Sequence, residues 1–214
     1  MKQLFAQLKS EFLSEYRSWS ETMGLLVFTW VIAYIIFRLR PDLSLPQFNF
    51  VIWIVFMMIA LNVALKGANH IQQKARGYLY SLMSPSIIFT AQIIFNLFYL
   101  FIATCAFYFS MILFYYPQVH FSWSYLGLLG MASVGVCAVL SFVGAISRHV
   151  QGQNTILSIL ALPLLIPVMI LIYQMGAEML INNPVPESKY IALIGISLLG
   201  ISLSLLLFPF IWKD

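Results

Sequence analysis

Residues 85–116 read PSIIFTAQIIFNLFYLFIATCAFYFSMILFYY and contain no charged residue. A helix needs about 20 apolar residues to cross a bilayer, so this stretch is long enough to span one. Polar sequence precedes it at residues 66–84, and Pro117 and His120 follow it. Pro85 suits the first turn of a helix, because the N–H that proline lacks needs no partner there. The sequence therefore predicts a membrane-spanning helix over residues 85–116.

The whole chain has the composition of an integral membrane protein. Of its 214 residues, 62% are hydrophobic and only 8% are charged, and the mean hydropathy is +0.93. Soluble domains carry about 25% charged residues. This composition excludes an ordinary soluble enzyme and a disordered chain. The net charge of +4 is scattered along the sequence, so we expect no nucleic-acid partner.

Further apolar stretches predict an all-α membrane protein with six spans in one domain over residues 21–214. The expected spans are residues 22–37, 50–65, 85–116, 125–146, 155–174 and 190–212. Residues 1–20 place apolar side chains at helical spacing, which predicts an amphipathic helix in the membrane interface. With a cytoplasmic N-terminus, eight Lys and Arg residues fall in inner segments and three in outer ones. The positive-inside rule therefore predicts that both termini are cytoplasmic.

Motifs for catalysis or energy coupling are missing from this sequence. It contains no GxxxxGK[ST] phosphate loop, no HExxH zinc motif and no GxSxG nucleophile motif. No expected span carries paired Asp or Glu residues, although a proton relay inside a membrane needs titratable groups. We therefore expect a non-catalytic protein without catalytic, cofactor-binding or metal-binding residues.

The cysteines and histidines indicate no site of their own. Cys105 and Cys137 lie in apolar runs, so we expect reduced, buried and inert thiols. His70, His120 and His149 lack the spacing of metal ligands. We expect all three histidines to be loop residues, and a haem contact by His120 is the alternative.

Polar and helix-breaking residues modify the apolar spans. We expect Asn62, Gln92 and Asn96 to form packing hydrogen bonds between helices. Pro163 and Pro167 each remove a backbone hydrogen bond and are expected to bend or break the fifth span. Such a kink can line a cavity, act as a hinge or be static. Glycines that permit close helix approach are Gly127, Gly130, Gly135, Gly144, Gly195 and Gly200.

The longest inner connection, residues 66–86, reads KGANHIQQKARGYLYSLMSPS. We expect the second span to continue as a helix to about Ala75, and Gly77 to supply a turn. An apolar face then follows at helical spacing, made by Tyr78, Leu79, Leu82 and Met83. A short exposed helix of this kind suits docking into a groove of another protein. A connecting loop on the lipid headgroups is an equal alternative.

Two segments resemble the heme exporter protein B family, a membrane component of the bacterial cytochrome c maturation system. Gly77, Leu79, Leu82 and the pair Ser84-Pro85 match the glycine, the two leucines and the Ser-Pro of the family's segment after span two. Residues 162–168, LPLLIPV, are similar to its Leu-Pro-x-x-x-Pro-Val segment in span five. The preceding Gly-Gln-Asn at residues 152–154 fits as well.

The resemblance implies an ABC-2-type permease in the bacterial cytoplasmic membrane that works with a separate cytoplasmic ATPase. The coupling contact with that ATPase would be made by Arg76, Gly77, Tyr78, Leu79, Leu82, Met83, Ser84 and Pro85. The complex would export haem or release a haem-loaded chaperone, together with other maturation proteins of the membrane. Two copies per complex are implied, because ATPases of this class work as pairs. No cofactor is expected to bind tightly, because Trp123 stands alone where a haem-handling membrane protein carries a tryptophan-rich motif.

One departure from the family concerns its acidic residues. Gln72, Gln73 and Lys74 precede the glycine, and Tyr80 follows the first leucine, where the family often has acids. Ion pairs of such acids with an ATPase are therefore not expected here. The alternatives are a generic ABC-2-type exporter permease for lipid, polysaccharide or drug, and a membrane scaffold without transport.

Overall fold

The computed structural model describes residues 7, 13, 19–73, 85–116, 119–147 and 153–211. This part of the chain is helical and holds no strand. The helices are α2 Trp19–Leu39, α3 Leu45–Gln73, α5 Pro85–Tyr115, α6 Trp123–Ser147, α7 Gln153–Leu180 and α8 Glu187–Ile211. Most of the amphipathic helix expected at residues 1–20 lies outside the described residues, as does the centre of the connection 66–86.

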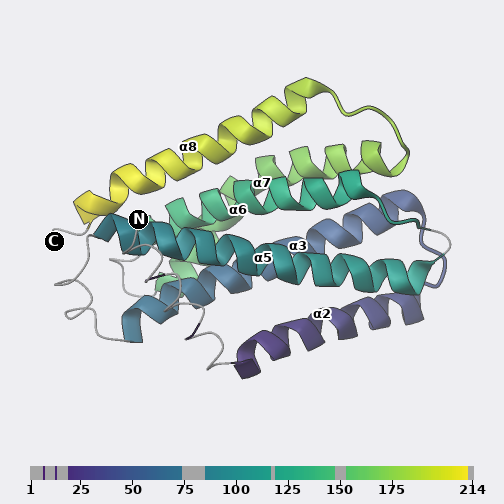
Figure 1. Ribbon diagram of the computed structural model, residues 1–214, viewed down its shortest axis with the longest axis horizontal. Coiled ribbons are helices and arrows are strands. Elements are labelled where there is room, and N and C mark those ends of the chain that lie inside the picture. The colour runs from purple at the N-terminus through teal and green to yellow at the C-terminus, as the bar shows by residue number, and fades with distance from the viewer. Residues whose placement is uncertain are drawn as a thin grey trace.

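The helices form a bundle in which neighbours along the chain reverse direction (Figure 1). α6 is the central helix and packs against α3, α5, α7 and α8, whereas α2 lies at the edge and packs against α5. α2, α5 and α7 end at Leu39, Tyr115 and Leu180, on the same side of the bundle. We call that side the outer end, because the positive-inside rule predicts that it faces away from the cytoplasm.

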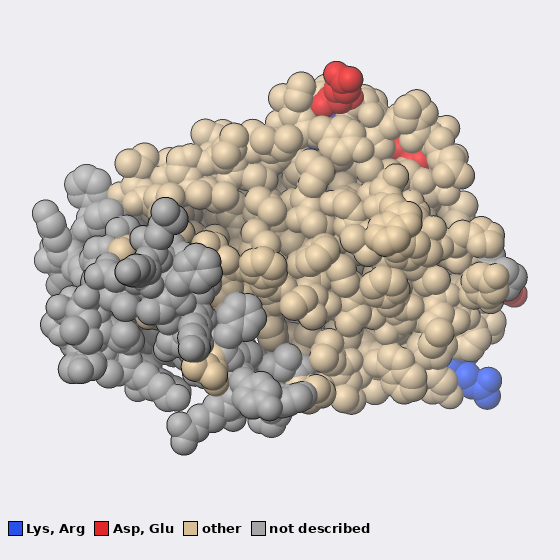
Figure 2. Space-filling model, in the orientation of Figure 1, with Lys and Arg blue, Asp and Glu red and all other residues tan. Residues whose placement is uncertain are grey.

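Five helices are long and apolar enough to cross a membrane: α3, α5, α6, α7 and α8. The apolar part of α2, Met23–Leu39, is shorter. α5 and α6 contain no Asp, Glu, Lys or Arg. On the face drawn in Figure 2, the charged side chains of the described residues gather at the outer end and leave the body of the bundle uncharged. The chain thus has the character of a multi-pass all-α membrane protein, and the sixth span, over α2, stays a prediction.

Local hydrogen bonds explain where α3 and α6 begin. The Gln47 side chain accepts a hydrogen bond from the Ser44 N–H at 3.2 Å, and the Ser44 carbonyl accepts one from the Phe48 N–H at 2.9 Å. This is half of a capping box, in which the third helical residue reaches back to the cap. At α6, the Ser122 hydroxyl accepts from the Tyr125 N–H at 3.4 Å, as an N-cap does.

α7 ends later than the sequence analysis predicts. The fifth span was expected to stop at residue 174, but the helix continues to Leu180. The Asn183 N–H donates to the Glu178 carbonyl at 2.9 Å, and the Asn182 N–H donates to Met179 at 3.2 Å. Asn182 has a φ of 57°, so this is a Schellman motif with asparagine in the left-handed position. The boundary at residue 174 was wrong because Gly176 looks like a loop signal.

α6 and α8 approach each other closely at two of the six expected glycines. A Cβ added to Gly135 would lie 3.1 Å from the Ser197 hydroxyl, and one added to Gly200 would lie 3.1 Å from the Ala138 backbone. The prediction of close approach is confirmed at these two positions. The other four glycines have ordinary contacts or open space around them: Gly127, Gly130, Gly144 and Gly195.

Replacing Gly200 with valine is expected to lower the free energy of unfolding by about 1–3 kcal/mol, because the side chain overpacks a contact with backbone atoms. Gly195→Val is the matched control on the same helix, since nothing lies within 4 Å of its Cβ position. The measurement is unfolding of the purified protein in detergent micelles. Equal effects of the two substitutions would contradict the proposed role of the close contact.

Candidate functional site

The expected docking segment, residues 76–85, is flanked by described residues but is not itself described, apart from Pro85. Seven of its eight expected contact residues lie outside the described part: Arg76, Gly77, Tyr78, Leu79, Leu82, Met83 and Ser84. Pro85 begins α5, as predicted, and α3 continues to Gln73, close to the predicted Ala75. α3 and α5 also pack against each other. The two ends of the segment are therefore anchored in neighbouring helices of one bundle.

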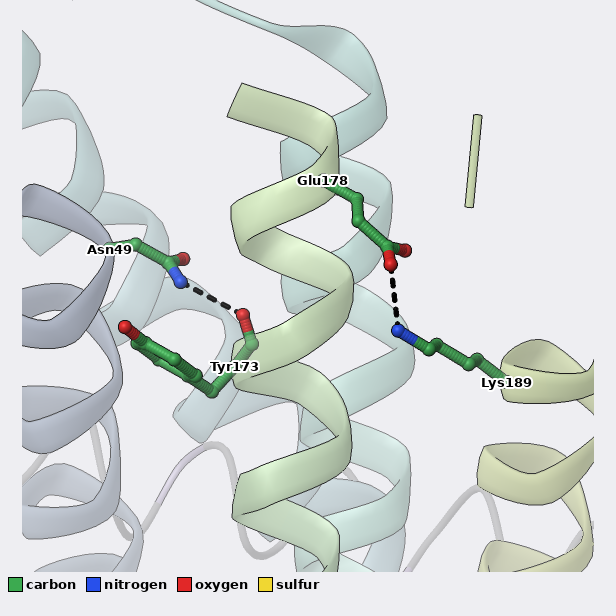
Figure 3. Close-up of polar contacts among 4 residues, drawn as sticks. All are labelled: Asn49, Tyr173, Glu178 and Lys189. Carbon is green, nitrogen blue, oxygen red and sulfur yellow. Dashed lines mark hydrogen bonds and ion pairs between the residues drawn. The ribbon is translucent and has the colours of Figure 1, made fainter. Parts of the chain in front are cut away.

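A buried asparagine joins three helices near the outer end. Asn49 on α3 is fully buried. Its side-chain oxygen accepts hydrogen bonds from the Trp53 indole N–H at 2.8 Å and from the Tyr125 hydroxyl on α6 at 2.9 Å. Its amide nitrogen donates to the Tyr173 carbonyl on α7 at 2.9 Å (Figure 3). We call these four residues and Gly176 the outer polar cluster.

Gly176 on α7 makes room for this cluster. A Cβ at this position would lie 2.8 Å from Trp53 Nε1 and closer still to Asn49 Oδ1. Only glycine leaves space for the amide and the indole at this crossing of α3 and α7. The sequence analysis missed the cluster because it began the second span at Phe50 and placed Gly176 in a loop. The one available signal was the spacing of Asn49 and Trp53, which puts them one helical turn apart.

Aromatic side chains surround the outer polar cluster. Tyr108 stacks on Tyr125 with ring centroids 5.1 Å apart. Phe37 on α2 stacks on Phe114 of α5 at 5.5 Å, which attaches the edge helix. Tyr116 and Trp123 extend this belt to the exposed surface of the outer end, and Trp and Tyr are enriched at membrane–water interfaces.

His120 is an exposed residue at the outer end, as the sequence analysis predicts for a loop histidine. Its ring meets Tyr116 edge-on with centroids 6.1 Å apart. Among the residues that the structure describes, no group of three or more His, Cys, Asp or Glu side chains is placed to hold a metal ion.

An ion pair ties α7 to α8 at the outer end. The Lys189 ammonium lies 2.8 Å from Glu178 Oε1 (Figure 3). The two side chains are only 21% and 28% exposed, so water screens the pair incompletely. The same glutamate supplies the backbone carbonyl of the Schellman motif. The turn between α7 and α8 is thus held by both the backbone and the side chain of Glu178.

The two prolines do not break α7. One helix runs through both positions, and Pro163 and Pro167 lie on its outward face. The inward face carries buried residues at helical spacing, including Ala161, Leu165 and Val168. The prolines therefore face away from the core of the bundle, and a hinge or a cavity lining at these positions stays a prediction.

The polar residues of the spans divide into two groups. Asn62 is exposed and donates to the Met58 carbonyl of its own helix at 2.8 Å, so the expected bond to another helix was wrong for this residue. Gln92 and Asn96 lie on α5 and face a cavity that α3 and α6 also line. Cys137 borders the same cavity and is a buried free thiol, as predicted, whereas Cys105 is free but only partly buried.

Replacing Asn49 with leucine is expected to lower the free energy of unfolding by about 2–4 kcal/mol, because three hydrogen-bonding groups lose their common partner. Asn62→Leu is the control on the same helix, and its exposed site predicts a change within about 0.5 kcal/mol. Both variants are measured by denaturant unfolding in micelles. A loss for Asn49→Leu no larger than that of the control would show that the cluster does not stabilise the bundle.

Comparison with known proteins identifies no relative. No protein-family model matches the chain, and no curated protein or solved structure matches it either. The likeness to the heme exporter protein B family accordingly rests on the sequence segments alone.

Proposed function

We propose that this chain is the non-catalytic permease subunit of an ABC-2-type complex for c-type cytochrome biogenesis. A separate cytoplasmic ATPase supplies the energy, and the complex exports haem or releases a haem-loaded chaperone. The observation that carries the proposal is the match of Gly77, Leu79, Leu82 and Ser84-Pro85 to the family's segment, at a position between two packed helices.

The distribution of charge supports an external source of energy. α5 and α6 provide neither carboxylates nor amines, so they offer no titratable relay for coupling to a proton gradient. The sequence also lacks a phosphate loop for nucleotide binding. A partner that hydrolyses ATP would supply the energy that these two observations leave without a source.

The anchoring of the docking segment supports mechanical coupling. α3 ends at Gln73 and α5 begins at Pro85, so a force on the residues between them enters two helices of the bundle together. In the proposed arrangement α2 completes six spans, both termini face the cytoplasm, and two copies stand over two ATPases. Haem is handled as substrate, without a tight site on this chain.

A generic ABC-2-type exporter for lipid, polysaccharide or drug is the second candidate. Gln72, Gln73, Lys74 and Tyr80 favour it, because they replace acids that the heme exporter protein B family often carries. This candidate keeps the permease architecture and the ATPase partner and changes only the substrate.

Replacing Leu79 and Leu82 together with aspartate is expected to reduce co-purification of the ATPase about tenfold or more, because the two charges would enter an apolar groove without partners. Ser188→Asp is the control, since Ser188 is exposed at the opposite end of the bundle. The amounts of ATPase and permease are compared after mild detergent extraction. Undiminished association of the double variant would refute docking through this segment.

Deleting the chain is expected to abolish assembly of c-type cytochromes, because haem would no longer reach the apoproteins in usable form. Covalently bound haem in membrane extracts is the measurement, and re-expression of the wild-type chain is the control. Normal cytochromes in the deletion strain would favour the generic exporter.

A further inference from the structure

A cavity lies within the half of the bundle that faces away from the outer end. It is formed by α3, α5 and α6, and the start of α7 closes one wall. Most of its lining is apolar and buried, for example Ala60, Leu100 and Leu157. Three polar side chains also line it: Gln92, Asn96 and Ser141.

The polar groups of the cavity can hold small hydrogen-bonding molecules. Gln92 and Asn96 are four residues apart on α5 and so share one face of that helix. Ser141 Oγ donates to the Cys137 carbonyl at 2.7 Å and keeps its lone pairs for a further donor. The Asn96 side chain is half-buried, and its amide makes no hydrogen bond to the residues that the structure describes. In the hydrocarbon region of a membrane an amide without a partner is costly, so this position favours a bound water.

The size of the cavity decides what that partner is. The cavity offers about 30 Å³ to the centres of water molecules. One water needs roughly 10–15 Å³ by this measure, so about two waters fit in this partly open cavity. We propose that the cavity is an intramembrane hydration site, in which water bridges Asn96 on α5 to Ser141 on α6. All residues of this hydration site come from this chain, and the proposal does not depend on the proposed permease function.

Radical footprinting of the wild-type protein in lipid nanodiscs tests whether water is present. X-rays generate hydroxyl radicals from bound water, and these oxidise nearby sulfur atoms even in buried places. Cys137 lines the cavity and is 4% exposed, whereas Met111 and Met175 are fully buried elsewhere. The oxidation rate of each residue is divided by the oxidation rate of the same residue in the unfolded protein, which corrects for the different reactivities of cysteine and methionine.

We expect Cys137 to be oxidised at exposures that leave Met111 and Met175 intact. Oxidation of Cys137 as slow as that of the two methionines would overturn the proposal, because the cavity would then be dry or filled by an acyl chain.

The nearly isosteric variant Asn96→Leu tests whether the water is bound by the amide. In a hydrated cavity the water loses a partner, and the apparent melting temperature falls by about 2–6 °C. In a dry cavity the variant removes an unpartnered amide, and the melting temperature rises. Asn62→Leu is the control, because Asn62 is exposed and lies outside the cavity. A rise for Asn96→Leu beyond that of the control would count against the bridging water.

Discussion

Close contact between helices is the constraint on which this structure depends. Inside a bilayer, lipid tails compete with every apolar side chain, so helices associate through tight packing and hydrogen bonds between them. The chain uses both, at different places. Gly135 and Gly200 let α6 and α8 approach closely, and Asn49 bonds α3 to α6 and α7. The central position of α6 follows, because its small residues accept neighbours on several sides.

These contacts are distributed unevenly along the bundle. The outer end holds the outer polar cluster, the aromatic belt and the pair of Glu178 with Lys189. The opposite half holds the cavity beside Asn96. Tight packing and hydrogen bonds between helices resist rearrangement, whereas a polar cavity leaves room for side chains to shift. At the outer end Glu178 Oε2 is the exception, since it is buried without a hydrogen-bond partner among the described residues. The outer end is therefore the stiffer half, and the half nearer the expected docking segment is the more adaptable one.

Hydrophobic length predicted where the helices lie, because apolar runs of α3, α5, α6, α7 and α8 differ sharply from their flanks. It failed where a residue's role depends on a distant neighbour. Gly176 suggested a loop, but it is the crossing point of α7 and Asn49. Asn62 suggested a bond between helices, but it bonds its own helix. Asn182 ends α7 because it adopts a left-handed φ. The spacing of apolar residues in the sequence does not reveal that conformation. Such contacts are properties of the packed bundle and not of any one segment.

The length of α3 gives the proposed function a mechanical route. From Gln73 to Asn49 this helix covers roughly 36 Å at about 1.5 Å per residue, without a proline between them. A push on the expected docking segment would enter α3 near Gln73 and travel along this continuous helix. At the far end the Asn49 amide donates to the Tyr173 carbonyl, so a movement of α3 there acts on α7 as well. In the proposed complex, an ATPase on the cytoplasmic side would thereby act on the outer end, where the proposed function would have haem or its chaperone handled.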